Sequence, residues 1–115
     1  MRIAVCSINT PEILAYAQYT VLNIRSYCNI NGYDFIESGI IDTTRNVSWS
    51  RIKLIEKILN GEYGNNYDWI MWVDADVVVT NKNIKIENII DNYGRKDGID
   101  YDIIMPKEDC CDYVI

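Results

Sequence analysis

The segment "DWIMWVDADVVVT", residues 68–80, decides how the fold is interpreted. Its apolar residues predict a buried strand that runs through the whole segment. Asp74 and Asp76 interrupt this strand, and carboxylates are seldom fully buried unless they are paired or hold a metal ion. We therefore expect both carboxylates where the chain leaves the core, and we expect the valines at 77–79 to return it to the interior.

Strands and helices alternate along the rest of the chain. The strands are expected at residues 2–8, 33–38, 68–80 and 101–109, and the helices at residues 12–31, 48–61 and within 81–94. This order predicts an α/β domain whose mainly parallel sheet has helices on both faces. Ligands bind such sheets beyond the carboxyl ends of the strands, which is where Asp74 and Asp76 are expected.

The spacing of apolar residues predicts which side of each helix faces the core. The inward residues are expected to be Leu14, Ala17, Val21, Ile24 and Cys28 in the first helix, Ile52, Ile55, Ile58 and Leu59 in the second, and Ile86, Ile89 and Ile90 in the third. Gly32 and Gly61 are expected to end the first two helices.

Composition excludes several classes of function. The 115 residues carry a net charge of −6, which argues against general binding of nucleic acids or anionic membranes. The absence of histidine excludes Ser-His-Asp and Cys-His mechanisms for this chain. Of the four cysteines, Cys6 and Cys28 are predicted to be small core residues, and Cys110 and Cys111 are predicted to be reduced thiols. No membrane segment or signal peptide is recognisable, so a cytoplasmic location is expected.

Asp74 and Asp76 together predict a metal site. Side chains two apart on a strand share a face, and the two Cα atoms would lie roughly 6–7 Å apart. This distance suits a divided role, in which one carboxylate ligates the ion and the other contacts a neighbouring ligand group or a metal-bound water. Hard ions held by few carboxylates keep positions for phosphate oxygens, so Mn²⁺ or Mg²⁺ with a diphosphate ligand is indicated. The alternative is that one aspartate caps a turn while the other is solvated.

Three segments in order resemble one enzyme family. "YDWIMWVDADVVV" resembles the D-x-D strand of glycosyltransferases with the GT-A fold, which use nucleotide-diphospho-sugars. "NIRSYCNINGYDF" is similar to a segment of the retaining galactosyl-, xylosyl- and mannosyltransferase family, and "WSRIKLIEKIL" resembles a helix of that family. The resemblance implies that residues 1–115 are the Rossmann-like, donor-binding N-terminal half of a single GT-A domain. The acceptor half, with a late histidine that completes the metal shell, would follow.

The resemblance also implies roles for individual residues. Asp76 would ligate Mn²⁺ (or Mg²⁺), and Asp74 would contact the ribose or the metal through water. The end of the first strand would lie beside the nucleotide base; its residues are Cys6, Ser7 and Ile8. Lys53 or Arg51 would offset phosphate charge. The implied donor is a UDP- or GDP-sugar, and the implied acceptor is a glycan or a protein.

Two other functions fit the same motif. In a haloacid-dehalogenase-like phosphatase, Asp74 would be the nucleophile and Asp76 the general acid–base, although that motif normally lies on the first strand. A non-catalytic module could instead bind nucleotide-sugars without turnover. Phosphatase activity with Mg²⁺ would indicate the first alternative, and nucleotide binding without transfer or hydrolysis would indicate the second.

Overall fold

The structure is a computed structural model that describes residues 1–39, 44 and 47–105. The chain divides into two compact units, Met1–Lys82 and Asn83–Ile115. The first unit contains the sheet and the D-x-D motif, so the functional argument depends on it.

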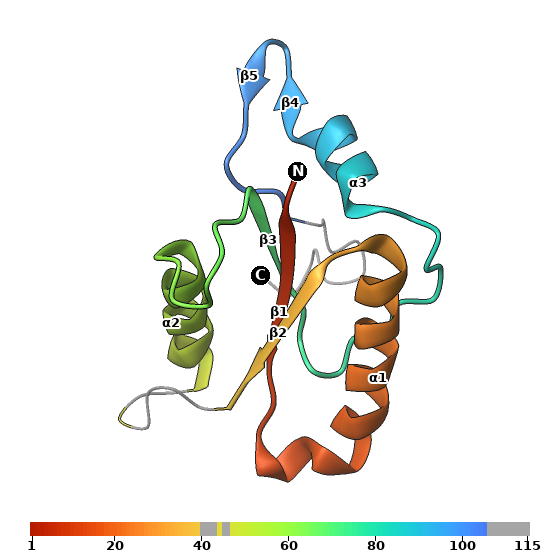
Figure 1. The fold of residues 1–115 in the computed structure, drawn as a ribbon, viewed down its shortest axis with the longest axis vertical. Helices are drawn as coiled ribbons and strands as arrows, with labels where there is room; N and C mark the ends of the chain where they lie inside the picture. Colours follow the sequence, from red (N-terminus) through yellow and green to blue (C-terminus); the bar gives the residue numbers. More distant parts are fainter. Residues whose placement is uncertain (40–43, 45–46, 106–115) are drawn as a thin grey trace, which may run out of the picture. The chain divides into compact units, whose positions relative to one another are not determined.

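A parallel sheet of three strands, β1 (Ile3–Ile8), β2 (Asp34–Ser38) and β3 (Trp69–Trp72), forms the centre of the first unit. The strand order is β2-β1-β3, so β1 is the central strand (Figure 1). All six residues of β1 are buried, as expected for an apolar strand covered on both faces. The predicted α/β class with a parallel sheet is confirmed.

Two helices lie on opposite sides of this sheet (Figure 1). A 3₁₀ turn, Pro11–Ile13, leads into α1 (Leu14–Asn31), and α2 spans Val47–Leu59. Gly32, with φ of 76°, ends α1 in the left-handed conformation that glycine adopts without steric cost. Both helices therefore lie close to their predicted positions.

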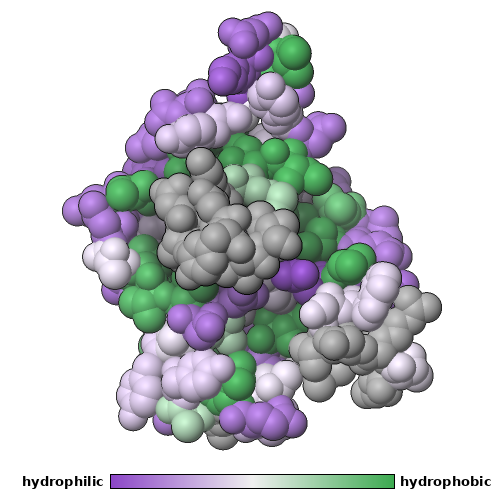
Figure 2. Space-filling view, turned by 180° about the vertical axis from the view of Figure 1, so that it is seen from behind, coloured by the Kyte–Doolittle hydropathy of each residue, from purple (hydrophilic) through white to green (hydrophobic). Residues whose placement is uncertain are grey.

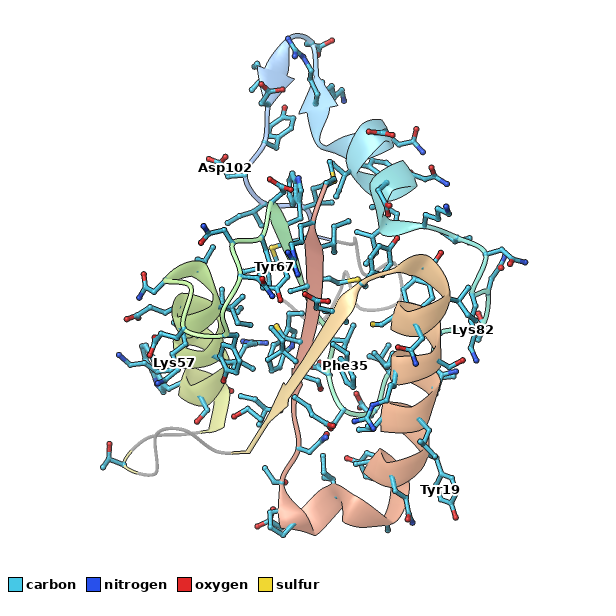
Figure 3. All side chains as sticks on the ribbon, in the orientation of Figure 1. Tyr19, Phe35, Lys57, Tyr67, Lys82 and Asp102 are labelled. Atoms are coloured by element: carbon cyan, nitrogen blue, oxygen red, sulfur yellow. The ribbon has the colours of Figure 1, made fainter. Side chains whose placement is uncertain are left out.

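The alternation of side chains along β1 divides the core between the two faces. Towards α2, the core contains Ala4, Cys6, Ile8, Ile36, Leu54 and Ile58, with Ile55, Tyr67, Ile70 and Trp72 packed against it. On the α1 side, a small cavity is lined by residues of β1, β2 and α1, among them Ser7, Ile24 and Phe35. Figure 3 shows Phe35 between β2 and α1. The sheet is thus buried on both faces, as predicted.

The predicted inward face of α2 is partly wrong. Ile58 is buried, but Ile52 and Leu59 are 50% and 66% exposed, and Leu54, which was not predicted, is fully buried. The reason is geometric: Leu54 and Ile58 are four residues apart and share the inward face, whereas Ile52 and Leu59 are seven residues apart and share a face that points away from it. In α1 the prediction is confirmed for Ala17, Ile24 and Cys28, which are buried.

Two of the three valines after the D-x-D motif do not return to the interior. β3 ends at Trp72, and Val77 and Val78 are 38% and 54% exposed. The predicted strand over 68–80 is therefore too long. Figure 2 shows that hydrophobic side chains lie at the surface among charged ones on the face that it presents.

The second unit contains α3 (Ile86–Tyr93) and an antiparallel pair, β4 (Arg95–Lys96) and β5 (Ile99–Asp100). Asp97 and Gly98 connect the pair with φ of 54° and 79°, as in the Asp-Gly hairpin turn.

The expected fourth parallel strand, 101–109, is not formed by residues 101–105, and residues 106–109 lie outside the described residues. Of the residues predicted to face inward in α3, Ile86 is buried, but Ile89 is 36% exposed. Across the parts of the chain that the structure describes, no helix is long and apolar enough to cross a membrane.

Candidate functional site

An open pocket of about 150 Å³ lies at the carboxyl ends of β1 and β3. It is lined by Ile8, Ser48, Arg51, Trp72, Asp74 and Ala75. The chain continues from β1 to β2 on one side of the central strand and later places β3 on the other side. This change of direction leaves a crevice beyond the strand ends, which is the usual ligand site of open α/β sheets.

Asp74 and Asp76 belong to a turn and not to a strand. The Val77 N–H donates to the Asp74 carbonyl at 3.2 Å, which closes a four-residue turn, and Asp is favoured at the first position of such turns. The predicted shared face and the Cα spacing of an ideal strand therefore do not apply. Both aspartates are exposed, as a carboxylate that meets a ligand requires.

Trp72 and Arg51 fix the environment of Asp74. The Trp72 indole Nε1–H donates to Asp74 Oδ1 at 2.8 Å, which leaves the other carboxylate oxygen available. The Arg51 guanidinium lies over the Trp72 ring, 5.7 Å from its centroid, a distance typical of a cation–π contact. A cation and a carboxylate therefore line the same pocket, held by one aromatic side chain.

The residues at the end of β1 differ in their access to this pocket. Ile8 lines it, whereas Cys6 is fully buried in the core beside α2. Burial raises the pKa of the Cys6 thiol to about 12, so this thiol stays protonated at neutral pH. Ser7 is buried and lines a separate cavity of about 10 Å³, together with Thr20 and Asp74. That cavity is no larger than a water molecule needs.

Lys53 does not line the pocket. It is 52% exposed, and its Nζ lies 3.9 Å from Glu56 Oε2 on the same helix. Its predicted role at the phosphates stays a prediction. Arg51, two residues earlier and therefore on nearly the opposite side of the helix, lines the pocket instead.

Sequence reasoning missed the contacts between α1 and the motif. Thr20 Oγ1 donates to the Ala75 carbonyl at 2.5 Å, and the Asn23 side chain pairs with the backbone of Val79. The partners are more than fifty residues apart in the chain, and no local pattern marks such a contact. The spacing of Thr20 and Asn23, three residues apart in the predicted helix, indicated that they share a face but not what that face contacts.

The donor set at the motif fits a hard divalent cation. Two exposed carboxylates suit Mg²⁺ or Mn²⁺, whose remaining positions are filled by water or phosphate oxygens. In the part of the chain that the structure describes, no group of three or more His, Cys, Asp or Glu side chains could hold an ion by itself. With these two carboxylates as protein ligands, water or oxygen atoms of a ligand would fill the remaining positions of an ion.

The sequence pattern of the galactosyl transferase GMA12/MNN10 family matches residues 4–95, which is more than half of the chain. The chain belongs to this family. The match runs from β1 through β3 to α3, so the pocket and both aspartates lie inside it.

A solved structure is similar to this chain: the crystal structure of a glycosyltransferase involved in the glycosylation of the major capsid of PBCV-1. The two share 26% sequence identity, with a TM-score of 0.64. The match covers 78% of this chain and 46% of that one, so this chain spans about half the length of the enzyme it matches. No match was found among curated proteins. The predicted relationship to glycosyltransferases and their α/β fold is confirmed.

Proposed function

We propose that this chain is the donor-binding part of a metal-dependent glycosyltransferase that takes a sugar from a nucleotide-diphospho-sugar. The observation that carries the proposal is the position of the D-x-D turn. In a chain of this family, it lies beside an open pocket at the carboxyl ends of β1 and β3. The acceptor would be a glycan or a protein.

The pocket offers the two kinds of group that a metal–diphosphate ligand requires. On one side, Asp74 and Asp76 would hold Mn²⁺ or Mg²⁺. On the other side, Arg51 would bind a phosphate oxygen directly, since a guanidinium matches phosphate geometry. Ser48, in the first turn of α2, places the positive end of that helix at the same pocket.

These groups would act on the leaving group of the transfer. A bound divalent ion supplies Lewis-acid stabilisation of the departing nucleoside diphosphate. The Arg51 guanidinium stabilises the same negative charge, and Trp72 keeps the Asp74 carboxylate in one orientation through its indole N–H. Ile8 offers an apolar contact for the nucleoside beside the strand end.

The phosphatase alternative gains no support. The motif follows β3, the third strand in the chain and an edge strand of the three-stranded sheet, whereas the phosphatase motif normally follows the first strand. Family membership also favours sugar transfer.

A thermal-shift titration tests the proposal. Mn²⁺ with UDP, Mn²⁺ with GDP, and each component alone are added to wild type, Asp76→Asn and Asp91→Asn, the last as a control at an exposed carboxylate of α3. Because binding to the native state stabilises it, one nucleotide should raise the melting temperature only when Mn²⁺ is present. The rise should disappear in Asp76→Asn and persist in Asp91→Asn. A folded wild-type protein that shows no shift with either pair would refute donor binding by this chain.

A further inference from the structure

The segment that follows the D-x-D turn runs along α1 and is bound to it by side chains. Asn23 forms two hydrogen bonds with the backbone of Val79: its Oδ1 accepts from the Val79 N–H at 2.7 Å, and its Nδ2 donates to the Val79 carbonyl at 3.1 Å. Asn31 donates to the Lys82 carbonyl at 3.1 Å, and Figure 3 shows Lys82 beside α1. One stripe of this helix therefore holds the segment at several points.

Thr20 makes the contact that matters most for the aspartates. Its hydroxyl donates to the carbonyl oxygen of Ala75, the residue between Asp74 and Asp76, at 2.5 Å. A second acceptor, the Ala17 carbonyl within the helix, lies further away at 3.1 Å. Thr20 is only 8% exposed, so water does not compete for this bond.

We propose that Thr20 and Asn23 are positioning residues for the D-x-D turn. This inference rests on the proposed function, because it assigns them to the same metal–diphosphate site. The Ala75 carbonyl lies in the planar peptide unit that joins Ala75 to Asp76. By fixing the direction of that carbonyl, Thr20 fixes the plane from which Asp76 extends, and so the placement of Asp76 relative to Asp74.

Asn23 fixes the far end of the same segment. Its side-chain amide binds both the N–H and the carbonyl of Val79, the two backbone groups that a neighbouring strand would otherwise bind. The exposed stretch of Val77 and Val78 is therefore bounded by the turn on one side and by Val79 on the other. Neither Thr20 nor Asn23 lines the open pocket, so both act through the backbone of the turn.

Binding of Mn²⁺ in the presence of UDP, or of GDP if UDP does not bind, tests this role. The electron paramagnetic resonance signal of free Mn²⁺ measures the affinity without any need for turnover. Thr20→Val keeps the shape of the side chain and removes the hydroxyl, and Thr20→Ser restores the hydroxyl. Gln18→Leu is the control, because the Gln18 amide donates to the Ala15 carbonyl within α1 and to no other residue that the structure describes.

Thr20→Val should weaken Mn²⁺ binding by ~10-fold or more, the size of effect seen when groups behind a metal ligand are removed. Thr20→Ser should recover most of the affinity, and Gln18→Leu should match wild type. Asn23→Asp, which can still accept from the Val79 N–H but cannot donate to its carbonyl, should weaken binding less than Thr20→Val. If Thr20→Val does not fold, the Asn23→Asp variant tests the positioning role instead.

Hydrogen exchange separates failure of this inference from failure of the proposed function. The Val77 amide, which closes the turn onto the Asp74 carbonyl, should exchange faster in Thr20→Val, and the Val79 amide faster in Asn23→Asp, while the amides of β1 stay protected. A folded Thr20→Val protein with wild-type Mn²⁺ affinity overturns the positioning role and leaves the proposed function standing. A wild-type protein that binds Mn²⁺ with neither nucleotide overturns both.

Discussion

At the amino end of the sheet, the carboxylates are occupied by donors of the protein itself. Asp68 accepts from the Arg2 backbone N–H at 2.7 Å. Asp34 accepts from the Tyr67 hydroxyl at 2.6 Å and lies 3.5 Å from the Arg2 guanidinium. This network ties the starts of β1 and β2 to the chain just before β3.

Beyond the carboxyl end of β3, the two carboxylates of the D-x-D turn are left open. Asp74 receives one hydrogen bond from Trp72, and no hydrogen bond or ion pair joins the Asp76 side chain to another described residue. Aspartates lie at both ends, and they differ in how many hydrogen-bond donors the fold places beside them. A carboxylate that the fold satisfies contributes to structure, whereas an exposed one beside a pocket is available to a ligand.

Removing one carboxylate charge at each end tests this comparison most directly. Asp74→Asn should weaken binding of the Mn²⁺–nucleotide pair by up to ~100-fold, because it removes a charge that balances the metal ion. Asp34→Asn should leave this binding within ~2-fold of wild type and lower the free energy of unfolding by ~1 kcal/mol, the value of one partly exposed hydrogen bond. Isothermal titration and urea titrations measure the two effects.

The two variants should therefore show opposite profiles. If Asp34→Asn lost nucleotide binding while the protein stayed folded, the amino-end network would belong to the functional site. If Asp74→Asn bound the Mn²⁺–nucleotide pair like wild type, Asp74 would be only a turn residue, which is the alternative that the sequence left open for the motif.

A second prediction compares two cations of α2. Arg51→Met should weaken binding of the Mn²⁺–nucleotide pair by ~10-fold, because a hydrogen bond to a charged group is worth ~1.5–3 kcal/mol. Lys53→Met should change it by less than ~2-fold, since Lys53 faces Glu56 and not the pocket. Isothermal titration with and without Mn²⁺ distinguishes the two. An equal loss in both variants would show that the cations act only through net charge.

The sequence predicted the sheet and the helices that cover it, but it did not predict where the strands end. Helical and strand periodicities predicted β1, α1, β2 and α2, because each of these elements buries a face and carries that pattern. They failed after Trp72, because three valines in a row look like a strand whether or not a neighbouring strand pairs with them. Only the structure shows that pairing stops there and that Asp74–Val77 is a turn.

For the site, Asp74 and Asp76 were indicated by their position in an apolar segment, and the structure places Asp74 in the lining of an open pocket and Asp76 in the same turn. The resemblance to a family added Ile8, which also lines that pocket. It could not choose between Arg51 and Lys53, because both lie in the same helix and their directions depend on how α2 packs. The contacts of Thr20 and Trp72 depend on tertiary structure, so no spacing rule predicted them. The metal ion, the donor and a cytoplasmic location stay predictions.

The smallest expected effect concerns the amino end and its dependence on pH. Burial, and then the hydrogen bond to Asp34, raise the pKa of the Tyr67 hydroxyl above its usual value near 10. Because the native state holds this proton more tightly than the unfolded state, the resulting stability is fully present below pH ~10 and is lost as pH rises through the raised native pKa. Tyr67→Phe should lower the free energy of unfolding by ~1 kcal/mol near neutral pH.

The difference between Tyr67→Phe and wild type should then shrink as pH rises above about 10, since the variant has no proton to lose there. The buried thiols of Cys6 and Cys28, whose pKa values are raised to about 12 and about 11, destabilise both proteins in the same alkaline range, so only the difference reports on Tyr67. Tyr19→Phe is the matched control, because Tyr19 is 70% exposed and Figure 3 shows it pointing away from the sheet. A difference that stays constant up to pH 11 would mean that the Tyr67 pKa is not raised by folding. A difference near zero at neutral pH would mean that the Tyr67 hydroxyl contributes nothing through its bond to Asp34. The network at the amino end would then be held by Arg2 alone.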